Sequence, residues 1–143
     1  DTERQAFLDT YIHFVSETYF EHTSKEYNEY ELDMTDKCTK AIVMANPFIL
    51  HAQPGALSYL KDCGFKTFYK WWDESYDNDK DHNSRKNKLY NLYQKLSNTS
   101  HQELTEMLYE MYDVLEYNRD HYNDFKDGSK HYNKFYKKLN MMF

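Results

Sequence analysis

The spacing of apolar and polar residues along the chain changes near residue 77. Before that point, apolar residues gather in short runs separated by polar stretches. After it, leucines and aromatic residues recur every three or four positions, which is typical of the buried face of an amphipathic helix. The pattern predicts an α/β region at 1–80 and a helical extension packed on it at 81–143.

Three short runs in the first region are predicted to be strands. Residues 11–16 are rich in aromatic and β-branched side chains, which favour a strand. The run 48–52 is apolar and is bounded by proline on both sides, at Pro47 and Pro54, as expected of a strand buried on two faces. A third short strand is predicted at 65–69.

Two helices are predicted between these strands. Thr35 is a good N-cap for a helix that continues to Met44 and stops before Pro47. Pro54 suits the first turn of the second helix, because that turn needs no N–H from it. Gly64 suits the left-handed residue that closes a helix. The order of strands and helices predicts βαβ units and a parallel sheet.

The second region predicts three helices. One spans about 84–96, and the next begins with a capping box formed by Ser100 and Glu103. Gly128 interrupts the pattern, and a last helix is predicted at 132–139. The apolar face of the middle helix is formed by Leu104, Leu108, Met111, Leu115 and Tyr122.

Charge and composition narrow the class of protein. The net charge of -6 argues against a general nucleic-acid binder. The lysines of the stretch 126–138 are interpreted as the solvent-exposed face of the last helix. We expect no membrane span and no secretory signal, hence a cytoplasmic protein with Cys38 and Cys63 reduced. The chain starts with Asp1, so a truncated or processed form of a longer protein is a further expectation.

Residues 77–81 alternate carboxylates and raise the question of a metal site. An EF-hand is excluded, because the sixth position is His82 and the twelfth is Lys88. We interpret the stretch as a solvated loop before a helix and predict no metal. For Trp71 and Trp72 we favour core packing, with at most one ring facing a ligand, because adjacent side chains point in different directions.

Candidate binding residues cluster at predicted strand ends and helix starts. Glu17 follows the first strand, Thr35, Asp36 and Lys37 begin a helix, and His51 to Gly55 follow the second strand. In open α/β sheets, ligands bind at the carboxyl edge, where helix N–H groups attract anions. The alternative interpretation of 35–37 is an ordinary helix cap. No P-loop, G-x-G-x-x-G, H-E-x-x-H or Ser-His-Asp pattern occurs.

Several segments carry a family resemblance: FVSETYFE, MTDKCTKAI, NPFIL, PGALSYLKDCGFKTF and WWDESYD. Together they resemble the carboxyl-terminal half of GT-B-like glycosyltransferases of viruses and bacteria, and more loosely inverting fucosyltransferases. The resemblance covers roughly residues 11–77, and Asp36 stands where the family pattern has Glu.

The resemblance implies a Rossmann-like half-domain of GT-B type, with a helical carboxyl-terminal extension. It implies that Glu17, Thr35, Asp36 and Lys37 bind a nucleotide-diphosphate sugar as substrate, with no further cofactor. His51 and Gly55 join this predicted site because they follow the second strand, where we predict a phosphate contact for His51; the alternative is an ordinary surface or core histidine. A second domain or partner chain would then supply the acceptor site and the catalytic base. If the protein is viral, we expect it in the host cytoplasm. The alternative is a non-catalytic interaction or assembly module that keeps the fold without activity.

Overall fold

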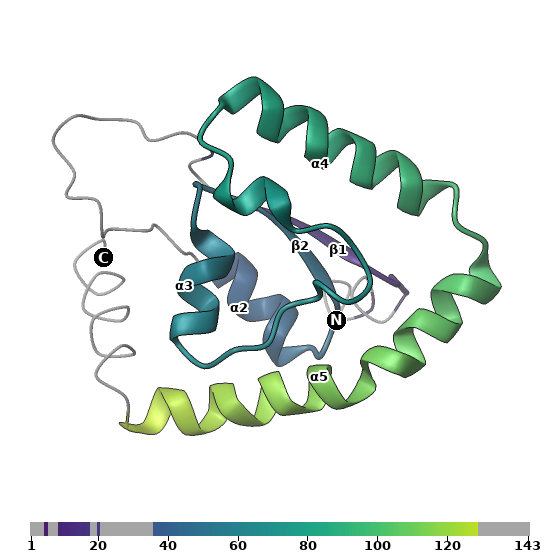
Figure 1. The fold of residues 1–143 in the computed structure, drawn as a ribbon. Helices are drawn as coiled ribbons and strands as arrows, with labels where there is room; N and C mark the ends of the chain where they lie inside the picture. The colour runs from purple at the N-terminus through teal and green to yellow at the C-terminus, as the bar shows by residue number, and fades with distance from the viewer. Residues whose placement is uncertain (1–4, 6–8, 18–19, 21–35, 129–143) are drawn as a thin grey trace, which may run out of the picture.

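The computed structural model describes residues 5, 9–17, 20 and 36–128 (Figure 1). The predicted N-cap Thr35 and the predicted last helix at 132–139 lie outside the described residues. Within the described part, the elements follow the order β1, α2, β2, α3, a 3-10 turn η1, α4 and α5.

A parallel pair of strands forms the centre of the fold. β1 (His13–Ser16) pairs with β2 (Phe48–His51), so that Phe14 lies beside Ile49 and Ser16 beside His51. The helix α2 (Asp36–Val43) lies between the two strands in sequence, as parallel strands require a crossover. The predicted α/β class is confirmed, as a small parallel sheet of two strands in the described residues.

The core lies between this sheet and the helices. All three apolar residues of β2 are buried, which confirms the prediction of a strand enclosed on both faces. On α2, Cys38, Ala41 and Ile42 are buried at helical spacing. The long helix α5 (His101–Gly128) packs against α2 and contributes Met111 and Leu115 to the same core.

The helix α3 (Ala56–Asp62) begins later than predicted. Gly55 is its N-cap, with φ of 85°, and Pro54 lies in the preceding turn rather than in the first helical turn. The start is fixed by a distant residue, because the carboxylate of Asp77 accepts the N–H groups of Leu57 and Ser58 at 2.8 and 3.0 Å.

The strand predicted at 65–69 is wrong, because side chains hold that backbone in place of a neighbouring strand. The amide of Asn118 donates to the Lys66 carbonyl and accepts its N–H, each at 2.8 Å. Glu74 accepts the N–H of Phe68 at 2.8 Å. The extended segment therefore satisfies its polar groups without joining the sheet.

The acidic stretch 77–81 begins within η1 (Ser75–Asn78) and is only partly the solvated loop that was predicted. Asp77 is 3% exposed. Asp79 lies near the surface, where it accepts from Ser84 and pairs with Lys88 at 2.8 Å. Both contacts lower the pKa of Asp79 to about 2.

Two long helices, α4 and α5, border the sheet, α2 and α3. α4 (His82–Ser97) confirms the helix predicted at 84–96, and α5 begins with the predicted capping box, in which the Ser100 N–H donates to Glu103 at 3.0 Å. Figure 1 shows α4 and α5 as two arms that meet at one corner and frame the sheet, α2 and α3.

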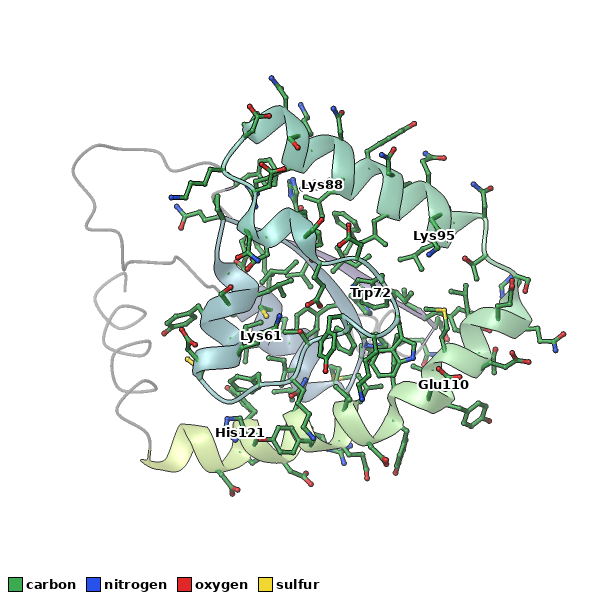
Figure 2. The ribbon with its side chains drawn as sticks, in the orientation of Figure 1. Lys61, Trp72, Lys88, Lys95, Glu110 and His121 are labelled. Carbon is green, nitrogen blue, oxygen red and sulfur yellow. The ribbon has the colours of Figure 1, made fainter. Side chains whose placement is uncertain are left out.

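The two tryptophans have different surroundings. Trp72 is buried and lies 5.2 Å from the ring of Phe68, which confirms core packing for this residue. Trp71 is half-buried and donates its indole N–H to Glu110 of α5 at 2.9 Å. Figure 2 shows Trp72 among the side chains that fill the space between the helices.

Two glycines at the ends of α3 provide a matched test of packing. Gly55 and Gly64 both have φ near 90°, but a Cβ on Gly55 meets nothing, whereas one on Gly64 lies 2.8 Å from His121. His121 is fixed by its contact with the Cys63 carbonyl at 2.8 Å. We expect Gly55→Ala to lower the free energy of unfolding by about 1–2 kcal/mol, from backbone strain alone. Gly64→Ala should cost about 1–3 kcal/mol more, because overpacking is added. Urea denaturation of both variants measures the difference, and equal costs would contradict the packing argument.

Candidate functional site

The carboxyl ends of β1 and β2 form one side of the candidate site. The N–H of Glu17 donates to the His51 carbonyl at 2.9 Å, which continues the pairing one residue beyond β1. The Ser16 hydroxyl lies 3.0 Å from Nδ1 of His51. The backbone of Glu17 and the side chain of Ser16 therefore both lie beside His51, at the strand ends that the sequence predicted to meet.

The first turn of α2 forms a second side. Burial raises the pKa of the Cys38 thiol, and the nearby Glu17 carboxylate raises it further, so Glu17 lies close to this turn. Glu17 itself is only 6% exposed. Asp36 and Lys37 are exposed at the start of α2, where Asp36 pairs with Lys40 at 3.6 Å. Glu17 thus lies near His51 through its backbone and near the start of α2 through its carboxylate, whereas the predicted Thr35 lies outside the described residues.

The amino end of α3 is occupied by a group of the protein itself. The Gly55 N–H donates to the Asp77 carbonyl at 2.8 Å, and the Asp77 carboxylate takes the N–H groups of the first helical turn. It also accepts the Ser58 hydroxyl at 3.1 Å. Because a carboxylate already fills this position, the start of α3 is closed to an anionic ligand. Gly55 therefore serves the turn into α3.

The pKa of His51 is lowered from its usual value. Burial lowers its pKa most, and the charges of Arg85, His82 and Lys86 lower it further. The ring stacks on Phe20, with centroids 4.1 Å apart. A lowered pKa disfavours the charged ring that would attract a phosphate, whereas a hydrogen bond with a hydroxyl needs no charge on the ring.

No protein-family model, curated protein or solved structure matches this chain. The glycosyltransferase resemblance therefore stays a prediction. Within the described ranges, no cluster of three His, Cys, Asp or Glu side chains is arranged to hold a metal ion. No helix described by the structure has both the length and the apolar character needed to cross a membrane.

Sequence reasoning missed Arg85, which supports the backbone next to the site. This residue of α4 is 2% exposed, and its guanidinium donates to the carbonyls of Tyr76 at 3.1 Å, of Phe20 at 2.8 Å and of Ala52. It also lies over the Phe20 ring, 4.2 Å from the centroid. These contacts tie the segments after β1 and β2 to α4. One signal was available: Arg85, Leu89 and Leu92 share the helical face that is buried.

Proposed function

We propose that this chain binds a nucleotide-diphosphate sugar at the carboxyl edge of β1 and β2, as the donor-binding part of a glycosyltransferase-like protein. One observation carries the proposal. The parallel register places Ser16 beside His51, the Glu17 N–H donates to the His51 carbonyl, and the Glu17 carboxylate is near Cys38 in the first turn of α2. A carboxyl edge of this kind is where α/β proteins bind nucleotides. The finer assignment to a Rossmann-like half-domain of GT-B type is part of the same proposal.

The diphosphate would lie at the start of α2. That helix has eight residues, and its first N–H groups and the ammonium of Lys37 offer positive charge on an exposed surface. The start of α3 is filled by Asp77, so α2 is the helix of this edge that suits an anion. Asp36 and Glu17 are acceptors for ribose or sugar hydroxyls, and His51 with Ser16 offers a further hydroxyl contact.

In the transfer reaction, the bond between the anomeric carbon and the diphosphate oxygen breaks, and the acceptor hydroxyl forms the new bond. Negative charge accumulates on the departing diphosphate, where the start of α2 and Lys37 stabilise it. The acceptor's proton goes to a base outside this chain. A second domain or a partner chain would hold the acceptor and that base.

A non-catalytic interaction or assembly module is the second candidate. The position of Asp77 favours this module. Its carboxylate occupies the start of α3, so only the start of α2 is left at this edge for a diphosphate. The two candidates differ in one property, since the module needs no affinity for nucleotides.

The expected effect of Asp36→Ala or Lys37→Ala is a loss of donor affinity of about 10-fold or more, because each removes a charge-assisted contact. Isothermal calorimetry with GDP, UDP, ADP and CDP, and with their sugar conjugates, measures it. Lys95→Ala and Asp113→Ala are matched controls, since both residues are exposed on α4 and α5. Equal affinity of Asp36→Ala and Asp113→Ala would reject the role of Asp36. Absence of binding by every nucleotide at millimolar concentration would favour the module.

A further inference from the structure

The outer edge of β1 exposes backbone groups that can form hydrogen bonds. In a strand, alternate residues direct their N–H and C=O groups to opposite edges. The N–H groups of His13 and Glu17 donate to Pro47 and His51, toward β2. The backbone groups of Phe14 and Ser16 therefore point away from β2, and no described residue forms a hydrogen bond with them.

This edge has one of the features that normally prevent pairing, its length of four residues, and lacks the others within the described part of the chain. Natural edge strands are protected by short length, lysine, proline, a bulge or a covering segment. β1 has the sequence HFVS, without lysine or proline, and its register with β2 is regular. Phe14 is 42% exposed, so part of its ring is open to contact. A parallel sheet of two strands is small for stability in water, so a further strand would complete it.

We propose that β1 pairs with β1 of a second copy of this chain, in antiparallel direction. A two-fold axis at Val15 places Phe14 opposite Ser16 of the partner subunit, and Ser16 opposite Phe14 of the partner subunit. Both residues of each pair direct their N–H and C=O groups outward, so the two pairs form four hydrogen bonds. The contact is self-complementary, as a two-fold interface requires. The product is one continuous sheet in the order β2, β1, β1, β2.

The side chains on this edge suit a second copy. The two Phe14 rings lie diagonally across the pair on one face, within reach of aromatic contact. Phe14 already meets Tyr93 edge to face at 6.0 Å, and Tyr93 is half exposed, so pairing would cover both rings. A hollow of about 280 Å³ lined by Phe14, Ile49, Tyr93 and Leu96 adjoins them. No residue of His13–Ser16 carries a formal charge at neutral pH, so pairing brings no like charges together within the strands, although each chain has a net charge of -6.

Sedimentation equilibrium between about 1 and 500 μM tests the proposal. We expect the mass to rise from 17.5 kDa toward twice that value with concentration. Phe14→Lys should weaken association at least 10-fold, because two lysines then meet across the axis. Ser16→Pro should do the same, since it removes an outward N–H and leaves the bonds from His13 and Glu17 to β2 in place.

Tyr109→Lys is the matched control, because Tyr109 is an aromatic residue of α5 that is 78% exposed. It should leave association unchanged. Circular dichroism of each variant verifies that the helices are retained. A mass of one chain at every concentration would overturn the proposal. The same result is expected if this edge pairs with a strand of another protein instead of a second copy. Association that survives both Phe14→Lys and Ser16→Pro would also overturn it, because the contact would then lie elsewhere.

Discussion

Replacing Arg85 with methionine is expected to lower the free energy of unfolding by about 3–5 kcal/mol, the largest effect of any exchange considered. Methionine keeps much of the volume but donates no hydrogen bond. The carbonyls of Tyr76, Phe20 and Ala52 would then lose the donor that they share. Unsatisfied buried acceptors cost about 1–3 kcal/mol each, and some of the loss would be recovered by water.

Chemical denaturation, followed by tryptophan fluorescence and circular dichroism, measures the loss. Lys86→Met is the control, because Lys86 is the next residue of α4 and is exposed, so its change should stay within about 0.5 kcal/mol. Similar losses for the two variants would mean that Arg85 does not hold the three segments together. Arg85→Lys should fall between them, since an ammonium cannot reproduce the fork of donors.

Asp77→Ala is expected to cost about 2–3 kcal/mol, because it removes the carboxylate that takes two N–H groups and a hydroxyl of α3. Its charge also favours the cationic form of Arg85, against the burial that lowers the pKa of the guanidinium. Asp73→Ala is the matched control. Asp73 accepts from the N–H and hydroxyl of Ser75 at 2.9 and 2.8 Å, but these bonds are local and exposed. Thermal unfolding of the pair should show a loss below about 1 kcal/mol for Asp73→Ala. Equal losses would contradict the assignment of Asp77 as the residue that fixes α3.

The parts of the fold that depend on local sequence were predicted. The capping box at Ser100 is read from four residues, and the helix α4 from a leucine spacing, so both were confirmed. β2 was predicted from an apolar run bounded by proline on both sides, and the structure confirms it. Local signals of this kind do not depend on what the rest of the chain does.

The errors have a common physical cause, which is a partner far away in sequence. The start of α3 is set by Asp77, twenty positions beyond Leu57. The segment 65–69 is held by Asn118, fifty-two positions beyond Lys66. In both cases a side chain satisfies backbone groups that propensity alone assigns to a helix turn or a strand.

The candidate site was predictable to the same extent. Strand order and parallel pairing suffice to bring Glu17 to His51, and the structure shows that contact. Arg85 was missed because the helix at 84–96 was predicted from its leucine spacing alone, whereas burial beside three carbonyls determines the place of Arg85. The filled amino end of α3 could not be read from the sequence, since it depends on the return of the chain at η1.

The central claim is that a nucleotide diphosphate binds at the carboxyl edge of the sheet, against the start of α2. Amide NMR spectra of the labelled chain, recorded during titration with GDP and with UDP to millimolar concentration, test it most directly. The account predicts saturable shifts for Glu17, Asp36, Lys37 and His51, with little change at Lys95 near the far end of α4 (Figure 2). Absence of shifts with either nucleotide, or shifts confined to α4 and α5, would contradict it.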